Sequence, residues 1–387
     1  MTVLIISGCS RDVENEEYVF GSTEKELCSL SDASKQALTF VQSLGIITRS
    51  SNDIGEIKTA YALTKDALLP IVGMRNNWSE VPDTILYVVN LKDDKGYVLV
   101  SAIDQNVLGY IEHGAMPEIS SITNPGFKLF LHGVIDDARD SRNRDDIDRG
   151  GPILEYPYTL DTLYTPMLTT KWGQEEPFNF YCPYVGTVRC PAGCVAVAVG
   201  QIVAYHEHPS SYNGTFFNWE SIKADSIPTY TPDQLSVAHL MVDIGRIVDM
   251  SYSDSVSSAS STNVAKCLDS LGYHHTSLLD YDYNTCMQEF EQSRPVYIKG
   301  SKPNSNYGYA WVLDGGLVRS KHAKNFGGDS YTRIDIQRLV HCNWGENGSQ
   351  DGYFHSDILD RELGVDITRT AYSQNVQIYY EIYPNSN

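Results

Sequence analysis

The chain has 387 residues and a formal net charge of −20 at pH 7, a length that is enough for about two domains with a core each. The negative charge excludes nucleic acid as a partner, because a phosphate backbone would be repelled. The 26 tyrosines, the 29 glycines and a charged fraction of only 20% are typical of a β-rich secreted protein rather than a helical bundle.

The first ten residues form a short apolar run that ends in a small–small–Cys step at Cys9. The run is too short to span a bilayer, and it resembles the end of a bacterial lipoprotein signal, in which Cys9 is lipidated after cleavage before it. The basic region that begins such a signal is missing, so a chance likeness stays open. Acidic residues typical of a flexible tether follow. We assign residues 1–30 to a lipoprotein-signal remnant and this tether.

Residues 31–150 carry the pattern of a small α+β domain. Apolar residues recur at helical spacing over residues 32–46, which predicts an amphipathic helix. Strands are predicted at 84–91, 96–101 and 108–114. The charged stretch 136–151 cannot bury itself, so we expect a domain boundary there that proteases reach.

The pattern changes over residues 151–387. A helix that begins at Cys194 comes first, and helical patterns follow near 234–250 and 262–271. Strands are then predicted at 295–299, 309–313, 335–343, 352–355 and 375–382. Helices followed by a run of strands indicate an α+β fold.

The step from Gly193 to Cys194 is the most informative feature of the chain, because it opens a run of small and branched apolar residues. A thiol at the start of this helix lies at the positive end of the helix dipole, beside unpaired backbone N–H groups. That position favours the thiolate and offers donors to a carbonyl oxyanion. Cys194 is therefore the candidate nucleophile of a cysteine peptidase.

A cysteine peptidase also needs a base, a group that orients the base and a further oxyanion donor. Gln174 is the candidate donor upstream of Cys194. Asn343 is suited to orient an imidazole, and Trp344 beside it is suited to shield that contact. The best downstream position for the base holds Tyr309.

Several ordered motifs together resemble the streptopain (interpain-like) family of papain-fold cysteine peptidases, over essentially the whole chain after the tether. The matching pieces are Trp-Gly-Gln at 172–174, Pro-Phe-Asn at 177–179, Cys-Pro at 182–183, Ala-Gly-Cys-Val-Ala at 192–196, Gln201, Tyr-His at 205–206, Asn-Trp at 218–219, Arg-Pro-Val-Tyr at 294–297, Asn-Trp-Gly at 343–345 and Asp-Gly-Tyr-Phe at 351–354. Agreement among so many motifs is far more specific than one Gly-Cys step.

This resemblance implies a papain-like catalytic domain over residues 151–387, with a helical part and an antiparallel sheet or barrel part. Residues 31–150 resemble the inhibitory prodomain of the family, so the chain corresponds to a zymogen. The implied partners are protein or peptide substrates and the chain's own prodomain, with no cofactor and no metal. The implied location is a secreted or outer-surface-anchored bacterial lipoprotein, with a lipid anchor at Cys9.

By the same resemblance Cys194 is the nucleophile, Gln174 forms the oxyanion hole, Asn343 orients the base and Trp344 shields it. The general base of the family is a histidine at the position of Tyr309. A phenol has a reference pKa of about 10 and a thiol of about 8.5, so no tyrosinate is available at neutral pH to take the thiol proton. A neutral phenol also cannot supply the positive charge that lowers a thiol pKa.

Residues 346–348 depart as well from the aromatic, glycine-rich continuation of the family after Trp344. We therefore predict a cysteine endopeptidase that is inactive or impaired. Two other hypotheses stay open. One is a non-catalytic protein that holds peptides or a partner in the old cleft, and the other is a working peptidase with a different base such as His322.

Individual residues also have alternative roles. Cys194 could be a small buried apolar residue. His341 lies two residues before Asn343 and so on the same strand face, and it is interpreted as structural. A zinc site is the rival for the cysteine-rich segment, but its spacing matches no common ligand pattern. Its residues would be Cys182, Cys190, Cys194, His206 and His208.

Overall fold

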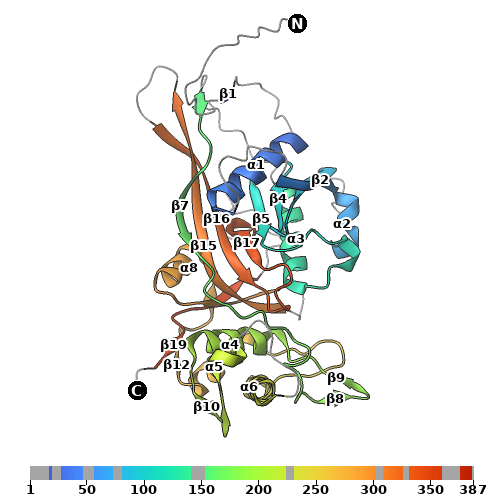
Figure 1. Ribbon diagram of the computed structural model, residues 1–387, viewed down its shortest axis with the longest axis vertical. Helices are drawn as coiled ribbons and strands as arrows, with labels where there is room; N and C mark the ends of the chain where they lie inside the picture. The colour runs from blue at the N-terminus through green and yellow to red at the C-terminus, as the bar shows by residue number, and fades with distance from the viewer. Residues whose placement is uncertain are drawn as a thin grey trace, which may run out of the picture.

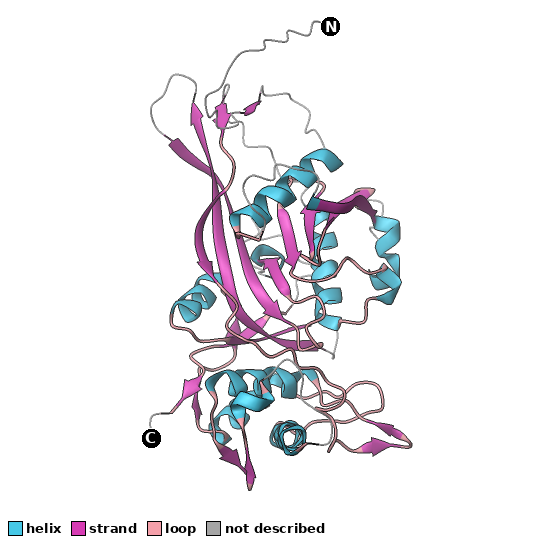
Figure 2. Ribbon diagram, viewed as in Figure 1, coloured by secondary structure: helices cyan, strands magenta, loops and turns pink. Residues whose placement is uncertain are grey.

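The computed structural model describes residues 17–19, 28–46, 56–72, 81–140, 153–223, 231–301, 308–325, 331–359 and 375–385. A large antiparallel sheet occupies the upper part of the molecule, and helices with short hairpins pack beneath it (Figure 1). Helices and antiparallel strands are mixed through the chain (Figure 2), as the α+β prediction requires. No helix in the described part of the chain combines the length and hydropathy needed to cross a membrane.

The N-terminal region contains the predicted helix and the three predicted strands. Its elements are β1 (Glu17–Val19), α1 (Leu30–Ser43), β2 (Ile57–Thr64), α2 (Lys65–Val72), β3 (Thr84–Leu91), β4 (Tyr97–Ser101), β5 (Val107–Ile111) and α3 (Pro125–Asp140). Helix α1 begins at Ser29 because the Ser29 hydroxyl accepts from the Asp32 N–H while the Asp32 carboxylate accepts from the Ser29 N–H. Its buried face carries Ala33, Ala37 and Phe40.

Helix α3 was not predicted from the sequence. It buries Phe127, Phe130 and Val134 at spacings of three and four residues. The helix continues to Asp140, so the charged stretch at 136–151 begins inside a helix. Residues 141–151 of that stretch lie outside the described residues.

The C-terminal region has short elements first and long strands later. Its elements are β6 (Ile153–Glu155), β7 (Thr159–Tyr164), β8 (Tyr184–Val185), β9 (Val188–Arg189), α4 (Cys194–His206), β10 (Ser211–Tyr212), β11 (Thr215–Phe216), α5 (Trp219–Ile222), α6 (Pro232–Ile247), α7 (Val264–Ser270), β12 (Tyr273–His274), β13 (Leu279–Asp280), α8 (Tyr283–Glu291), β14 (Val296–Ser301), β15 (Gly308–Asn325), β16 (Tyr331–Asn343), β17 (Gly352–His355), α9 (Ser356–Leu359), β18 (Gln377–Tyr379) and β19 (Tyr383–Pro384). Strands β15 and β16 are much longer than predicted and form the tall ribbon in Figure 1.

The sheet runs through both regions without a break. Along the sheet the strand order is β13-β18-β14-β15-β16-β17-β5-β4-β3-β2. Strand β17 of the C-terminal region pairs with β5 of the N-terminal region, with Tyr353 opposite Tyr110. The N-terminal strands therefore extend the C-terminal sheet through backbone hydrogen bonds.

Apolar residues form a core on each face of this sheet and a third core beneath it. Helix α1 covers one face, where Phe40 packs in a cluster with Leu317 and Leu339. Helix α3 covers the opposite face, where Phe130 packs against Phe354. Helix α4 lies in the third core with α6 and α7. Its residues 195–204 are all buried, which is why its apolar run shows little amphipathic pattern.

Candidate active site

Cys194 is the first residue of α4, and the residue before it determines how the helix begins. Gly193 has φ of +92°, and a Cβ there would lie 2.7 Å from the Cε atom of Met250. Only glycine adopts this conformation without strain. Because Gly193 has no side chain to cap the helix, the first N–H groups of α4 are left for the thiol or a ligand.

The Cys194 thiol is nevertheless held in its neutral form. Burial raises its pKa to about 11, and the negative charge of Glu346 acts in the same direction. The backbone N–H groups of Ala310 and Val195 lower the pKa but do not outweigh these effects. The end of a helix contributes only about 0.3–1 kcal/mol, less than one pKa unit. Burial and Glu346 thus oppose the thiolate that the helix end favours.

Tyr309 lies at the start of β15 and is only 7% exposed, so it is an internal residue of the site. Its hydroxyl oxygen lies 2.7 Å from the carbonyl oxygen of Trp344 and 2.7 Å from Oε1 of Glu346. Burial raises the pKa of the phenol well above its ordinary value, and the Glu346 charge raises it further. At neutral pH the hydroxyl can donate a proton in a hydrogen bond but cannot act as a base.

Glu346 connects Tyr309 to the predicted oxyanion donor. Nε2 of Gln174 donates to the same Oε1 atom of Glu346 at 2.7 Å. Burial raises the pKa of Glu346, while the hydrogen bonds from Tyr309 and Gln174 lower it in part. We call Gln174, Glu346, Tyr309 and the Trp344 carbonyl the Glu346 network. In the sequence, Glu346 was noticed only as a departure from the family pattern.

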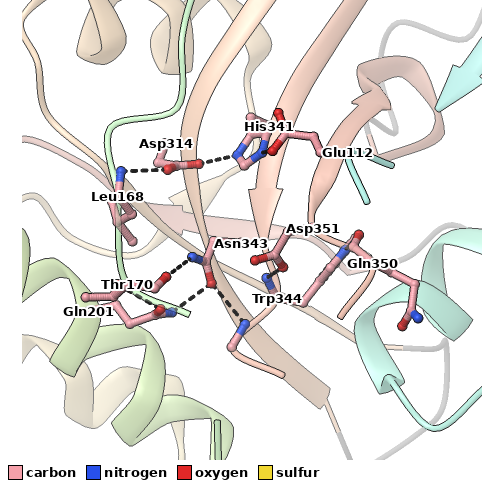
Figure 3. Close-up of polar contacts among 11 residues, drawn as sticks. Glu112, Leu168, Thr170, Gln201, Asp314, His341, Asn343, Trp344, Gln350 and Asp351 are labelled. Carbon is pink, nitrogen blue, oxygen red and sulfur yellow. Dashed lines mark hydrogen bonds and ion pairs between the residues drawn. The ribbon is translucent and has the colours of Figure 1, made fainter. Parts of the chain in front are cut away.

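Asn343 is held in a separate set of hydrogen bonds (Figure 3). Its Oδ1 atom accepts from Nε2 of Gln201 at 2.9 Å and from the N–H of Gly345 at 3.1 Å. Its Nδ2 atom donates to the carbonyl of Thr170 at 2.8 Å. The side chain thus joins α4 to β16 and to the segment before Trp172, whereas the Tyr309 hydroxyl is held by the Glu346 network.

Trp344 lies between the site and the N-terminal region. Its ring packs 5.1 Å from the ring of Trp311 and 5.1 Å from that of Phe354. Its indole N–H donates to the carbonyl of Gln350, and its backbone N–H donates to Asp351. Burial raises the pKa of Asp351 to about 7. These contacts fix the turn from Trp344 to Asp351, which carries Glu346.

A buried ionic cluster lies next to the site (Figure 3). Asp314 is the extra residue of a bulge in β15, where Leu313 and Gly315 pair with consecutive residues of β16. Its Oδ1 atom lies 2.6 Å from Nδ1 of His341, and its Oδ2 atom accepts from the Leu168 N–H at 2.9 Å. Asp314 is 0% exposed, so this charge needs a partner inside the protein.

The third member of this cluster comes from the N-terminal region. Nε2 of His341 lies 3.7 Å from a carboxylate oxygen of Glu112, which follows β5. Burial alone would lower the pKa of His341, but the Asp314 and Glu112 carboxylates raise it to about 10. We call Glu112, Asp314 and His341 the His341 cluster. His341 thus pairs with carboxylates of both regions.

Other sequence candidates lie elsewhere. His322 is thirteen residues beyond Tyr309 on the same strand and pairs with Arg333, on the order of 40 Å along the ribbon at the usual rise per residue. The hypothesis that His322 serves as the base is therefore wrong. Cys9 lies outside the described residues. The cysteines within the described part of the chain are free thiols, including Cys182 and Cys190.

Comparison with known proteins finds similar sequences. Residues 172–354 match the Peptidase C10 family. Streptopain of Streptococcus pyogenes is 24% identical over 392 aligned residues, covering 88% of this chain and 86% of that protein. The thiol protease/hemagglutinin PrtT of Porphyromonas gingivalis is 26% identical over 356 residues, covering 80% of this chain and 38% of that protein.

A solved structure shows the same fold. A fragment of Prevotella intermedia prointerpain A superposes with a TM-score of 0.56 at 24% identity, covering 78% of this chain and 96% of the fragment. The likeness confirms the predicted α+β fold, with a papain-like part and an N-terminal prodomain-like part.

Proposed function

From the match of residues 172–354 to the Peptidase C10 family and the similarity to streptopain, we propose that the chain is a cysteine endopeptidase of this family whose catalysis is impaired. Cys194 is proposed as the nucleophile, Gln174 as the oxyanion donor and Tyr309 as the residue in the place of the base. Asn343 and Trp344 are proposed to keep the positions of the orienting and shielding residues. Its substrates are proposed to be proteins or peptides.

The single observation that carries this proposal is the state of the Tyr309 hydroxyl. It is buried, its pKa is raised well above the ordinary value, and it donates toward the Trp344 carbonyl and Glu346. A general base must accept a proton near the working pH and typically contributes about 10²–10⁴-fold in rate. Without such a group Cys194 keeps its proton, and peptide binding in the cleft is the function that remains.

Hydrolysis of casein and of a fluorogenic peptide tests the proposal. The unaltered chain and Cys194→Ala are assayed from pH 5 to 9, before and after limited proteolysis, with papain as the positive control. We expect equal, background rates for the two proteins at every pH. Turnover that disappears in Cys194→Ala would show that another base operates and would refute the proposal.

The domain assignment supports a zymogen-like organisation. We propose residues 31–150 as the prodomain and residues 151–387 as the peptidase domain, on the support of the β5–β17 pairing and the contacts of α3 with the Trp344 turn. We also propose a location outside a bacterial cell, with a lipid attached at Cys9. The full-length gene product should incorporate radiolabelled fatty acid, and Cys9→Ser should not.

A further inference from the structure

We propose that Glu346 blocks the site, because its carboxyl group occupies the Gln174 donor and holds Tyr309, so that residues 309 and 346 act as one unit. Cysteine-peptidase chemistry then returns only when both residues are changed. This inference rests on the proposed function and extends it from a missing base to an oxyanion donor that another side chain already contacts. Glu346 is a positioning residue here, since it acts through its neighbours.

Gln174, the proposed oxyanion donor, already makes a hydrogen bond. An oxyanion donor must lie about 2.7–3.1 Å from the developing oxyanion. Oε1 of Glu346 already lies 2.7 Å from Nε2 of Gln174. One of the two N–H groups of this amide is therefore already used, and a substrate carbonyl must displace the carboxyl oxygen to use it. Both side chains are partly buried, so the displaced carboxyl group would need a new partner.

The placement of protons in the Glu346 network determines which groups donate and which accept. The Tyr309 hydroxyl carries one proton, yet it lies 2.7 Å from two oxygens. The Trp344 carbonyl can only accept. The phenol therefore either shares its proton between the two oxygens in a bifurcated hydrogen bond, or donates to the carbonyl and accepts from a protonated Glu346. Burial and the nearby charge of Glu175 raise the pKa of Glu346, while the hydrogen bonds with Tyr309 and Gln174 lower it in part. In both arrangements the contacts run from Gln174 through Glu346 and Tyr309 to the Trp344 carbonyl.

The thiol is affected in either protonation state of Glu346. When Glu346 is ionised, its charge raises the pKa of Cys194 and opposes the thiolate. When Glu346 is protonated, the Glu346 network keeps Gln174 occupied. Neither state of the side chain leaves the site with both a thiolate and a free oxyanion donor.

A histidine placed at position 309 would meet the same carboxyl group. An imidazolium beside an ionised Glu346 would form a charge-assisted hydrogen bond, which is about twice as strong as a neutral one. That bond would hold the ring on Glu346 instead of on the Cys194 thiol. We therefore expect Tyr309→His alone to recover little, and Tyr309→His with Glu346→Ala to recover much more.

The test compares full-length proteins by alkylation of Cys194 with iodoacetamide from pH 5 to 9, followed by mass spectrometry of the Cys194 peptide. The proteins are the unaltered chain, Tyr309→His, Glu346→Ala and the double variant. At pH 6 the double variant should be alkylated at least about 10²-fold faster than the unaltered chain, because an imidazolium partner makes the thiolate available. Tyr309→His alone should gain less than about tenfold. Hydrolysis of the fluorogenic peptide should rank the proteins in the same order.

A matched control distinguishes the effect of the Glu346 hydrogen bonds from the effect of a nearby negative charge. Glu175→Gln in the Tyr309→His protein removes a second negative charge near Glu346 but leaves the Glu346 network intact. This protein should behave like Tyr309→His alone. Melting temperatures confirm that each variant is folded, and Glu346→Ser replaces Glu346→Ala if the alanine variant does not fold.

Two results would overturn the inference. Tyr309→His alone could match the double variant, or the folded double variant could show no gain at pH 6, and in both cases Glu346 is not the block. Either result leaves the proposed function standing. Cys194-dependent hydrolysis by the unaltered chain would instead refute the proposed function, so the two failures are distinguishable.

Discussion

At the scale of single residues, Asn343 is proposed to orient the base, yet its side-chain amide also links neighbouring segments of the chain. Both polar atoms of its side chain have buried partners, on Gln201, Gly345 and Thr170. The Tyr309 hydroxyl has two partners of its own in the Glu346 network. A role for Asn343 in stability is therefore separable from a role in orienting residue 309.

Replacing Asn343 by alanine should cost stability and leave the thiol unchanged. The substitution would leave the Gln201 amide and the Gly345 N–H without their acceptor, and each lost partner of a buried polar group costs about 1–3 kcal/mol. We expect the free energy of unfolding in urea to fall by about 2–4 kcal/mol. The pH profile of Cys194 alkylation should not move. A shifted profile with unchanged stability would instead assign Asn343 to the base position.

At the scale of elements, α3 supports the turn that carries Glu346 from outside the papain-like part. Nδ2 of Asn124, just before the helix, donates to the carbonyl of Ser349 at 2.7 Å. Gly126 lies so close to the indole that a Cβ on it would be 2.2 Å from Cε3 of Trp344. The geometry of the site therefore depends on a helix of the N-terminal region.

The change Gly126→Ala tests this contact, because we expect it to lower stability here, whereas in most helices it raises stability. In an ordinary helix position this change stabilises by about 0.5–1 kcal/mol. Here the new methyl group must push the Trp344 ring, and overpacking of this kind costs about 1–3 kcal/mol. We expect a lower melting temperature and a changed tryptophan fluorescence spectrum. A higher melting temperature would show that α3 does not press on the indole.

At the scale of the whole molecule, the proposed domains share one sheet and one core. The cluster under α3 contains residues of both regions, such as Phe130 and Leu313. The β5–β17 pairing adds backbone hydrogen bonds between them. The shared core and the β5–β17 pairing therefore hold the two regions together independently of the backbone connection at residues 141–151.

Limited proteolysis should show whether the two regions stay together after the backbone between them is cut. We expect the first cuts within residues 141–151, because the charged stretch offers many polar sites and few apolar residues. The two fragments should still elute together in gel filtration under native conditions. First cuts between residues 190 and 340 would contradict the boundary, and separate elution of the fragments would contradict the shared core.

The His341 cluster joins the same two regions by charge, and it should make their stability depend on pH. The pKa of His341 is raised to about 10, so its stabilisation is complete below the unfolded value of about 6.5 and is lost as pH rises toward 10. The pKa of Glu112 is lowered because the His341 contact outweighs burial. Its stabilisation is present above the unfolded value of about 4.3 and is lost at lower pH.

The variant His341→Gln should therefore be most destabilised between about pH 4.5 and 6.5. Removing the imidazolium leaves Asp314 buried without a positive partner, which costs about 3–5 kcal/mol. The free energy of unfolding in urea, measured from pH 4 to 10, should differ most from the unaltered chain in that window and least near pH 10. The control His275→Gln removes an ion pair to Asp269, which is mostly exposed, and should cost about 0–1 kcal/mol. Equal effects of the two variants would show that the His341 cluster adds nothing.

The sequence by itself determined the features that depend on neighbours within a few residues. The spacing of Ala33, Ala37 and Phe40 predicted α1, and the step from Gly193 to Cys194 predicted the start of α4, because helix faces and caps are local. The motif at Asn343 predicted a residue that orients the base, which stays a prediction, and the structure shows that its amide is buried. The resemblance to the streptopain family also predicted, from the sequence alone, that Tyr309 stands at the position of the base.

Only the tertiary structure decided which distant groups meet. Gln174 and Glu346 are 172 residues apart in the chain, and no local pattern indicates that they share a hydrogen bond. The bulge that brings Asp314 to His341, and the pairing of β5 with β17, likewise depend on strand register. Burial raises the pKa of Cys194 and so opposes the end of the helix, which favours the thiolate. These outcomes follow from packing of the whole chain, because contact and desolvation are properties of a folded interior.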